Sequence, residues 1–229
     1  MPDPVGARQL PLVLPHEAAL GRDDFLIGGS NRDAFALVDG WPDWPSPVVV
    51  LAGPIGSGKT HLVEIWRAIS GAAIVDAGDL GSVDVAALAA QGAVAVEDAH
   101  LGFDETALFH LLNAARQSGT SVLITSRTWP QAWQLSLPDL ASRLRAATPL
   151  EILEPDDDLL RRVLVKLFSD RQIMVEPSVV DFLVTRMERS LFAAGRAVDS
   201  LDRKSLAEGR RITRPLAARC LESADPQAE

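Results

Sequence analysis

Apolar and polar positions alternate along this chain in two different ways, and the change falls near residue 150. Before it, short apolar runs rich in β-branched residues are separated by stretches whose apolar residues recur at helical spacing. This pattern predicts a parallel sheet with helices on both faces, because parallel strands need crossover connections that cover the sheet. Strands are expected at residues 48–52, 72–76, 93–96, 121–125 and 150–153, and helices at residues 31–40, 83–90 and 105–117, the first capped by Ser30 or Asn31.

After residue 154 only the helical spacing remains. It predicts a small all-α domain, with helices expected at residues 157–169, 178–189, 192–208 and 213–222. Three aspartates at positions 156–158 open the first helix, where carboxylates favour the positive end of the helix dipole. We therefore expect an N-terminal tail at residues 1–20, an α/β domain at 21–153 and a helical domain at 154–229.

The tail contains the short apolar segment Gln9-Leu10-Pro11-Leu12-Val13-Leu14 among several prolines, which favour an extended path. Two interpretations are open. The segment could pack on the domain as an arm, or it could dock into a partner's pocket as an extended peptide. The residues alone favour the packed arm, because short apolar segments are common.

The composition of the chain argues against several classes of protein. A net charge of −9 argues against binding nucleic acid through bulk charge, although a local basic patch stays open. The single cysteine, Cys220, excludes an internal disulfide and lies in an apolar stripe, where we expect it in the core. No apolar run reaches the ~18 residues of a membrane span, and the start lacks a signal peptide. A soluble, cytoplasmic protein without membrane contact is expected.

The first strand runs into Gly53-Pro54-Ile55-Gly56-Ser57-Gly58-Lys59-Thr60-His61, which satisfies the pattern G-x-x-x-x-G-K-T. Glycines let successive backbone N–H groups converge on a polyphosphate, and the N-terminus of the following helix adds partial positive charge. Lys59 is expected to reach the β- and γ-phosphates, and the Thr60 hydroxyl to bind Mg²⁺. The expected contacts to a nucleotide are Gly53, Ile55, Gly56, Ser57, Gly58, Lys59, Thr60 and His61.

Further polar groups follow other strands of the predicted sheet. Glu97 and Asp98 end the strand at residues 93–96, where one carboxylate can hold Mg²⁺ and the next can orient an attacking water. Ser126 follows the strand at 121–125 at the same edge, where ligands of such sheets bind. Arg143 lies at the end of a predicted helix. It is either a solvated surface residue or an arginine finger that meets a neighbouring molecule's γ-phosphate.

Together these motifs resemble the AAA+ ATPases, and within them the replication-initiator branch related to DnaA. The resemblance runs from about Asp24 to Leu221. It is carried by the phosphate loop, by Val96-Glu97-Asp98 and by the two segments Phe25-Leu26-Ile27-Gly28-Gly29-Ser30-Asn31 and Pro138-Asp139-Leu140-Ala141-Ser142-Arg143-Leu144. The family's initiators carry a longer N-terminal region and a C-terminal DNA-binding domain, for which we expect no room. The short form is similar to the Hda-type regulators that inactivate the initiator.

The resemblance implies roles for individual residues. Glu97 would take the metal-side position with Thr60, Asp98 the water-side position and Ser126 the sensor position, while Arg143 would be the arginine finger acting in trans. An ungapped match puts Phe192 at the lid's sensor position, with Arg189 and Arg196 about one turn to either side. The residues implied to lie against the adenine are Phe25, Leu26, Ile27 and Gly28.

The implied function is regulatory. Hda-type proteins carry an N-terminal peptide that binds the sliding clamp of DNA polymerase, and Gln9, Leu10, Leu12 and Leu14 are similar to it, which reverses the preference for a packed arm. Clamp on DNA would recruit this protein, and Arg143 would promote hydrolysis of the ATP bound to DnaA. The protein would meet DNA only through the clamp and would associate with the nucleoid through its partners, and self-association stays open.

Three departures from the family pattern bear on catalysis. Glu97 replaces the usual aspartate, and after the fourth strand Arg127 stands where the initiators tend to carry aspartate. The lid's sensor arginine is left open between Arg189, which is taken as a nucleotide contact, and Arg196. They favour ADP or ATP with Mg²⁺ as a conformational ligand, with at most weak intrinsic hydrolysis. Two other functions are left open, a helicase loader or transposition helper of the same superfamily and a small-molecule kinase. The loader would need a basic, aromatic surface for single-stranded DNA, and the sequence shows no interleaved strip of that kind.

Overall fold

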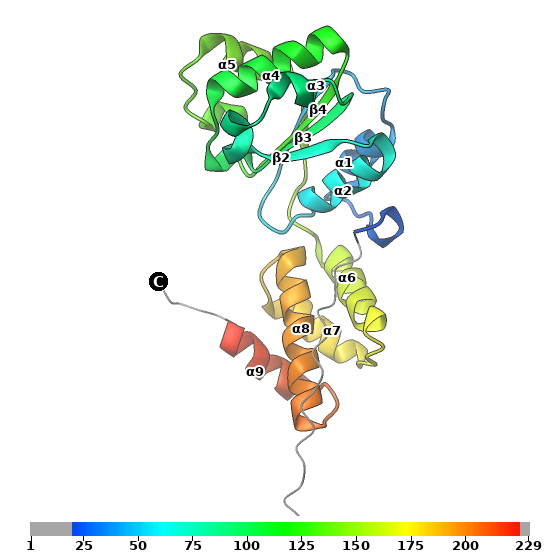
Figure 1. Ribbon diagram of the computed structural model, residues 1–229. Coiled ribbons are helices and arrows are strands. Elements are labelled where there is room, and N and C mark those ends of the chain that lie inside the picture. The colour runs from blue at the N-terminus through cyan, green and yellow to red at the C-terminus, as the bar shows by residue number, and fades with distance from the viewer. Residues whose placement is uncertain (1–19, 225–229) are drawn as a thin grey trace, which may run out of the picture.

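The computed structural model describes residues 20–224, which form two domains placed one above the other (Figure 1). The first domain holds a parallel sheet in the order β2-β3-β4-β1-β5. Each strand lies within two residues of its expected bounds, and the predicted α/β fold is confirmed. The strands are β1 Val48–Ala52, β2 Ala73–Asp76, β3 Ala93–Glu97, β4 Ser121–Ser126 and β5 Thr148–Glu151.

Helices cover both faces of the sheet (Figure 1). Alternate residues of a strand point to opposite faces, so Val49 and Leu51 pack with α1 and α2, whereas Val50 packs with α3, α4 and α5. The helices of this domain are α1 Arg32–Asp39, α2 Lys59–Ser70, α3 Val85–Ala89, α4 Glu105–Ser118 and α5 Pro138–Arg145. Short 3₁₀ helices are η1 Arg22–Asp24, η2 Ala77–Ser82, η3 Ala99–Leu101 and η4 Pro130–Ala132.

The second domain is the predicted helical lid. Its helices α6 Asp157–Asp170, α7 Pro177–Arg186, α8 Leu191–Glu208 and α9 Arg214–Ala224 enclose a separate apolar core. Cys220 is 1% exposed and belongs to this core, as its apolar stripe predicts. Along the described residues, no helix is long and apolar enough to cross a bilayer.

Two local predictions differ from the structure in detail. The predicted helix at 178–189 ends at Arg186, because Ser190 caps α8 by accepting from Ala193 N and the chain before it is extended. Asn31 stands at the expected N-cap position of α1, but its side chain makes no capping hydrogen bond. Its side chain bonds the backbone of Leu26 and Gly28 instead.

Replacing Leu108 by alanine should lower the free energy of unfolding by about 2–5 kcal/mol, because this α4 residue is fully buried between the helix layer and the sheet. Urea denaturation followed by circular dichroism measures the change. Leu101→Ala is the matched control, since Leu101 is 72% exposed, and its effect should stay within about 0.5 kcal/mol. Equal losses in both variants would contradict the assigned core.

Candidate functional site

The phosphate loop joins the end of β1 to the start of α2, and its glycines are required by close packing. A Cβ at Gly53 would lie 2.5 Å from the carbonyl oxygen of Ile152, and Gly56 and Gly58 have φ values of +66° and +105°. Only glycine adopts such conformations without strain. The first N–H groups of α2 have no partner within the helix, so this turn can receive an anion.

Lys59 folds back over this loop. Its ammonium donates to the carbonyl oxygens of Gly53 and Pro54, both at 2.8 Å, and the residue is 8% exposed. Burial lowers the pKa of Lys59, and the nearby Asp98 carboxylate opposes that shift. The buried Ser57 hydroxyl has no hydrogen-bond partner within residues 20–224. The loop therefore fits a polyphosphate. It offers the buried ammonium of Lys59, the Ser57 hydroxyl and a glycine turn whose backbone a phosphate can approach.

Thr60 and Glu97 lie side by side, as the sequence predicts for a metal pair. The Thr60 hydroxyl donates to Glu97 Oε1 at 3.1 Å. Burial raises the pKa of Glu97, and the hydrogen bond from Thr60 partly counteracts that shift. The part of the chain that the structure describes contains no cluster of three or more metal-ligating side chains. One carboxylate and one hydroxyl suit Mg²⁺ that also takes phosphate and water ligands.

Asp98 and Ser126 adjoin this pair at the ends of β3 and β4. Asp98 has φ +58°, and its backbone N–H donates to the Thr125 hydroxyl at 3.1 Å. The carbonyl of Ser126 accepts from Gly53 N at 3.2 Å, which ties β4 directly to the phosphate loop. The Ser126 hydroxyl accepts from Thr128 N at 3.1 Å. The structure thus brings Glu97, Asp98 and Ser126 together around the loop.

One histidine near the site is missed by the sequence analysis. His100 Nδ1 lies 3.7 Å from Asp98 Oδ1, and within the described residues neither ring nitrogen has a hydrogen-bond partner. Burial, followed by the charge of Arg127, lowers the pKa of His100. The imidazole also lines a cavity of about 200 Å³ behind Asp98. Its position two residues after the acids is the only sequence signal.

The segment Phe25–Gly28 reaches the site from the N-terminal side. Phe25 is buried, with its ring stacked on Phe35 at 5.5 Å and edge-on to His61 at 5.1 Å. Ile27 is 39% exposed, so it presents more accessible apolar surface than Phe25 does. A nucleobase on this segment would therefore meet Ile27 rather than the face of Phe25, which already packs on Phe35.

The lid touches the phosphate loop at the start of α8. The N–H of Leu191 donates to the Gly56 carbonyl at 2.8 Å, and a Cβ on Gly56 would lie 2.5 Å from the Ser190 hydroxyl. The two arginines near the lid's sensor position have other partners. Arg189 pairs with Asp157 on α6 at 2.7 Å, and the Arg196 guanidinium lies 5.2 Å from the centre of the Phe192 ring.

Arg143 lies away from this site. Its guanidinium stands 5.2 Å from the centre of the Phe109 ring, in a cation–π contact between α5 and α4. It lines a groove of about 660 Å³ with Arg116 and Val48, beside the start of β1, whereas the phosphate loop follows the end of that strand. The structure thus does not bring Arg143 to its own loop. Gln9, Leu10, Leu12 and Leu14 lie outside the described residues.

The parallel sheet, the phosphate loop and the attached helical lid define an AAA+ ATPase fold. Residues 157–221 match the family model described as "Hda, lid domain". An uncharacterised protein of Haemophilus influenzae is 30% identical over 195 residues, covering 78% of this chain and 83% of that protein. The chain belongs to the DnaA/Hda-like AAA+ proteins and is thus related to replication initiation.

Solved structures agree with this fold. Domain III of the Thermotoga maritima replication initiation protein DnaA superposes with a TM-score of 0.77 at 16% identity, over 92% of this chain and 98% of that one. AMPPCP-bound DnaA from Aquifex aeolicus gives a TM-score of 0.69 at 18% identity, over 82% of this chain and 66% of that one. At such identities the likeness concerns the fold alone.

Glu97→Gln should change how stability depends on pH when Mg²⁺ and nucleotide are left out. The pKa of Glu97 is raised above 4.5 in the folded protein, so folding holds this proton more tightly. The Glu97 contribution to the free energy of unfolding should therefore fall as pH rises from 4.5 to that raised pKa, and then level off. The glutamine variant lacks this fall, and it becomes the more stable protein as pH rises through this range.

Urea denaturation at a series of pH values measures this difference. Glu151→Gln, at an exposed carboxylate at the end of β5, is the matched control and should keep the wild-type profile. If the Glu97→Gln and wild-type curves run parallel, the partial burial of Glu97 carries no cost and the raised pKa of this carboxylate is wrong.

Proposed function

We propose that this protein is a nucleotide-binding regulator of replication initiation that acts in trans on the initiator DnaA. Tethered to the sliding clamp, it promotes hydrolysis of the ATP bound to DnaA, which returns the initiator to its inactive ADP form. The observation that carries this proposal is the separation of Arg143 from its own phosphate loop, across the length of β1. An arginine placed there is too far from its own loop to serve that site, and in trans it would meet another molecule's γ-phosphate.

The protein's own loop would hold ADP or ATP. Lys59 and the N–H groups at the start of α2 would receive the phosphates, and Ser57 would gain the partner that its buried hydroxyl lacks among the described residues. Thr60 and Glu97 would hold Mg²⁺, which supplies charge neutralisation between the phosphates. Asp98 would orient a water, and Ser126 would face the same phosphates from β4.

Intrinsic turnover is expected to be weak. In an ungapped match to the family, the apolar ring of Phe192 would take the place of a sensor arginine, and Arg189 is paired with Asp157. Few cationic side chains are therefore left to stabilise the negative charge of the transition state at this site. The loss of one such cation lowers the rate of hydrolysis by orders of magnitude. Bound nucleotide would instead set the position of the lid, through the contact between Leu191 and Gly56.

Arg143→Ala should abolish stimulation of the initiator's ATPase, by about 10³-fold or more, while ADP affinity of the variant itself stays unchanged. The assay measures phosphate release from DnaA with clamp-loaded DNA and purified regulator. Arg145→Ala is the matched control, because Arg145 is an exposed residue in the last turn of the same helix. Full stimulation by the Arg143 variant, or substantial turnover by the wild-type protein alone, would overturn the proposed role.

Gln9→Ala combined with Leu10→Ala should remove clamp binding without changing nucleotide affinity. The two side chains belong to the peptide that would dock into an apolar pocket on the clamp, so their loss removes both a polar and an apolar anchor. Surface plasmon resonance on immobilised clamp measures the effect. Arg8→Ala, just outside the segment, serves as the control. Persisting clamp binding in the double variant would show that tethering uses another surface.

A further inference from the structure

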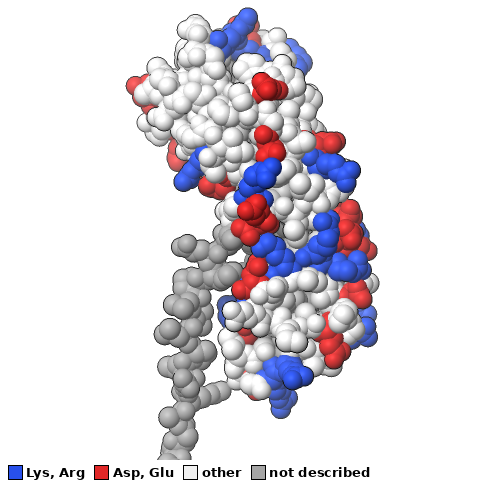
Figure 2. All heavy atoms as spheres, turned by 90° about the vertical axis from the view of Figure 1, so that its right-hand side faces the viewer, with Lys and Arg blue, Asp and Glu red and all other residues white. Residues whose placement is uncertain are grey.

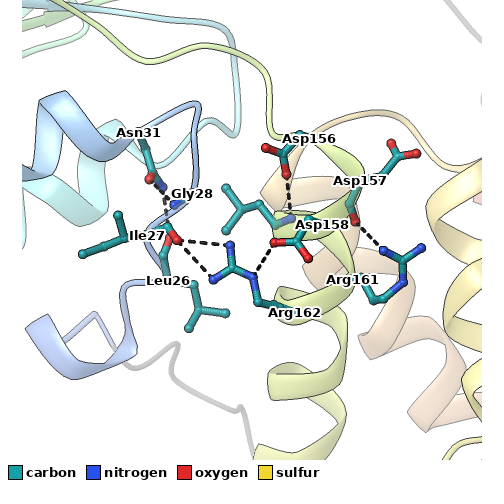
Figure 3. A network of polar contacts seen from close by, with 10 residues as sticks. Leu26, Ile27, Gly28, Asn31, Asp156, Asp157, Asp158, Arg161 and Arg162 are labelled. Atoms are coloured by element: carbon teal, nitrogen blue, oxygen red, sulfur yellow. Dashed lines mark hydrogen bonds and ion pairs between the residues drawn. The ribbon is translucent and has the colours of Figure 1, made fainter.

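One face of α6 holds the segment that runs from Asp24 to Gly28, and Figure 3 shows its contact with Ile27. Both terminal nitrogens of Arg162 donate to the carbonyl oxygen of Ile27 at 3.1 Å, and Lys166 pairs with Asp24 at 2.8 Å. Leu159 packs on Gly28, where an added Cβ would come within 3.1 Å of its side chain. These α6 residues follow one another at i, i+3 and i+7, so they form a single helical stripe.

The sheet domain holds the same segment from its other side. Asn31 is 1% exposed, and it accepts from Gly28 N at 2.8 Å and donates to Leu26 O at 3.0 Å. Successive backbone groups of the segment therefore bond alternately to Asn31 and to Arg162. A shift of α6 must either break the bond to Ile27 O or pull the segment away from Asn31.

Carboxylates within the lid orient the Arg162 and Lys166 side chains of this stripe. Asp158 accepts from Arg162 Nε at 2.9 Å, which leaves the two terminal nitrogens directed at Ile27 (Figure 3). The hydrogen bond from Lys166 lowers the pKa of Asp24, while Asp170, with help from Asp24, raises the pKa of Lys166. The face that carries η1 and α6 shows acidic and basic side chains interspersed between the two domains (Figure 2).

We propose that Arg162 is a positioning residue that couples the nucleoside end of the bound nucleotide to the lid. The inference rests on the proposed function, in which the phosphate loop holds ADP or ATP, and on the position of the base against the segment from Phe25 to Gly28 that the family resemblance implies. Arg162 touches the backbone of that segment and acts through it. Within the described residues, the hydrogen bonds of Arg162 go to Ile27 and Asp158 and not to the phosphate loop, so Arg162 acts on the base side of the ligand. Leu191 on α8 serves the phosphate side separately.

Two ligands distinguish an effect on the base side from one on the phosphate side. ADP has a nucleoside, whereas inorganic tripolyphosphate has phosphates only. In Arg162→Ala, ADP affinity measured by titration calorimetry should fall about tenfold, because a hydrogen bond from a charged donor is lost, while tripolyphosphate affinity stays within about twofold. Arg162→Lys keeps a cationic donor and should recover part of the loss. Arg161→Ala is the matched control, since Arg161 pairs with Asp181 at 3.0 Å inside the lid, and it should leave both affinities unchanged.

Hydrogen exchange without any ligand gives a second readout. The amide of Gly28 should exchange faster in Arg162→Ala than in Arg161→Ala, because its bond to Asn31 loses the support of α6. Unchanged ADP affinity in Arg162→Ala, or equal losses for ADP and tripolyphosphate, overturns the inference and leaves the proposed function standing. A wild-type protein that binds neither ligand overturns the proposed function and the inference with it.

Discussion

The missing side chain at Gly53 is the constraint on which the rest of the structure depends. Because no Cβ stands there, the chain leaving β5 passes directly over the start of the phosphate loop at Ile152. Ile152 N then bonds Ala52 O at 2.8 Å, and Leu153 N bonds Ser30 O at 3.0 Å. The chain therefore enters the lid already attached to β1 and to the N-terminal segment, and the direction of α6 follows from that attachment.

From this crossing the lid reaches the site at two places. The start of α8 bonds the turn of the phosphate loop at Gly56, and the stripe on α6 bonds the segment around Ile27. The contacts involve different helices, and both use backbone carbonyls of the first domain as acceptors. A ligand that spans the two places would contact segments bonded to both helices. The position of the lid could then depend on a whole nucleotide rather than on phosphate alone.

Elements defined by many residues, and side-chain contacts that belong to a known motif, were predictable from the sequence, whereas contacts of polar side chains outside such a motif were not. The strands and lid helices follow from long apolar patterns, and the pairing of Thr60 with Glu97 follows from the known geometry of such loops. The end of α7 was not predictable, because Ser190 overrides the helical pattern. The Arg162 contact leaves no sequence signal, since its acceptor is a backbone carbonyl 135 residues away.

Lys59 has a further consequence for what the loop can accept. An ammonium has three N–H donors, and two of them already serve the carbonyls of Gly53 and Pro54. An incoming group gains from Lys59 only what exceeds those internal bonds. A hydrogen bond from Lys59 to a neutral ligand oxygen is about as strong as its present bonds to the two carbonyls. A bond to an anionic phosphate oxygen is stronger, because the acceptor is charged as well. The loop should therefore bind ligands with an anionic terminal group more tightly than neutral ligands of the same shape.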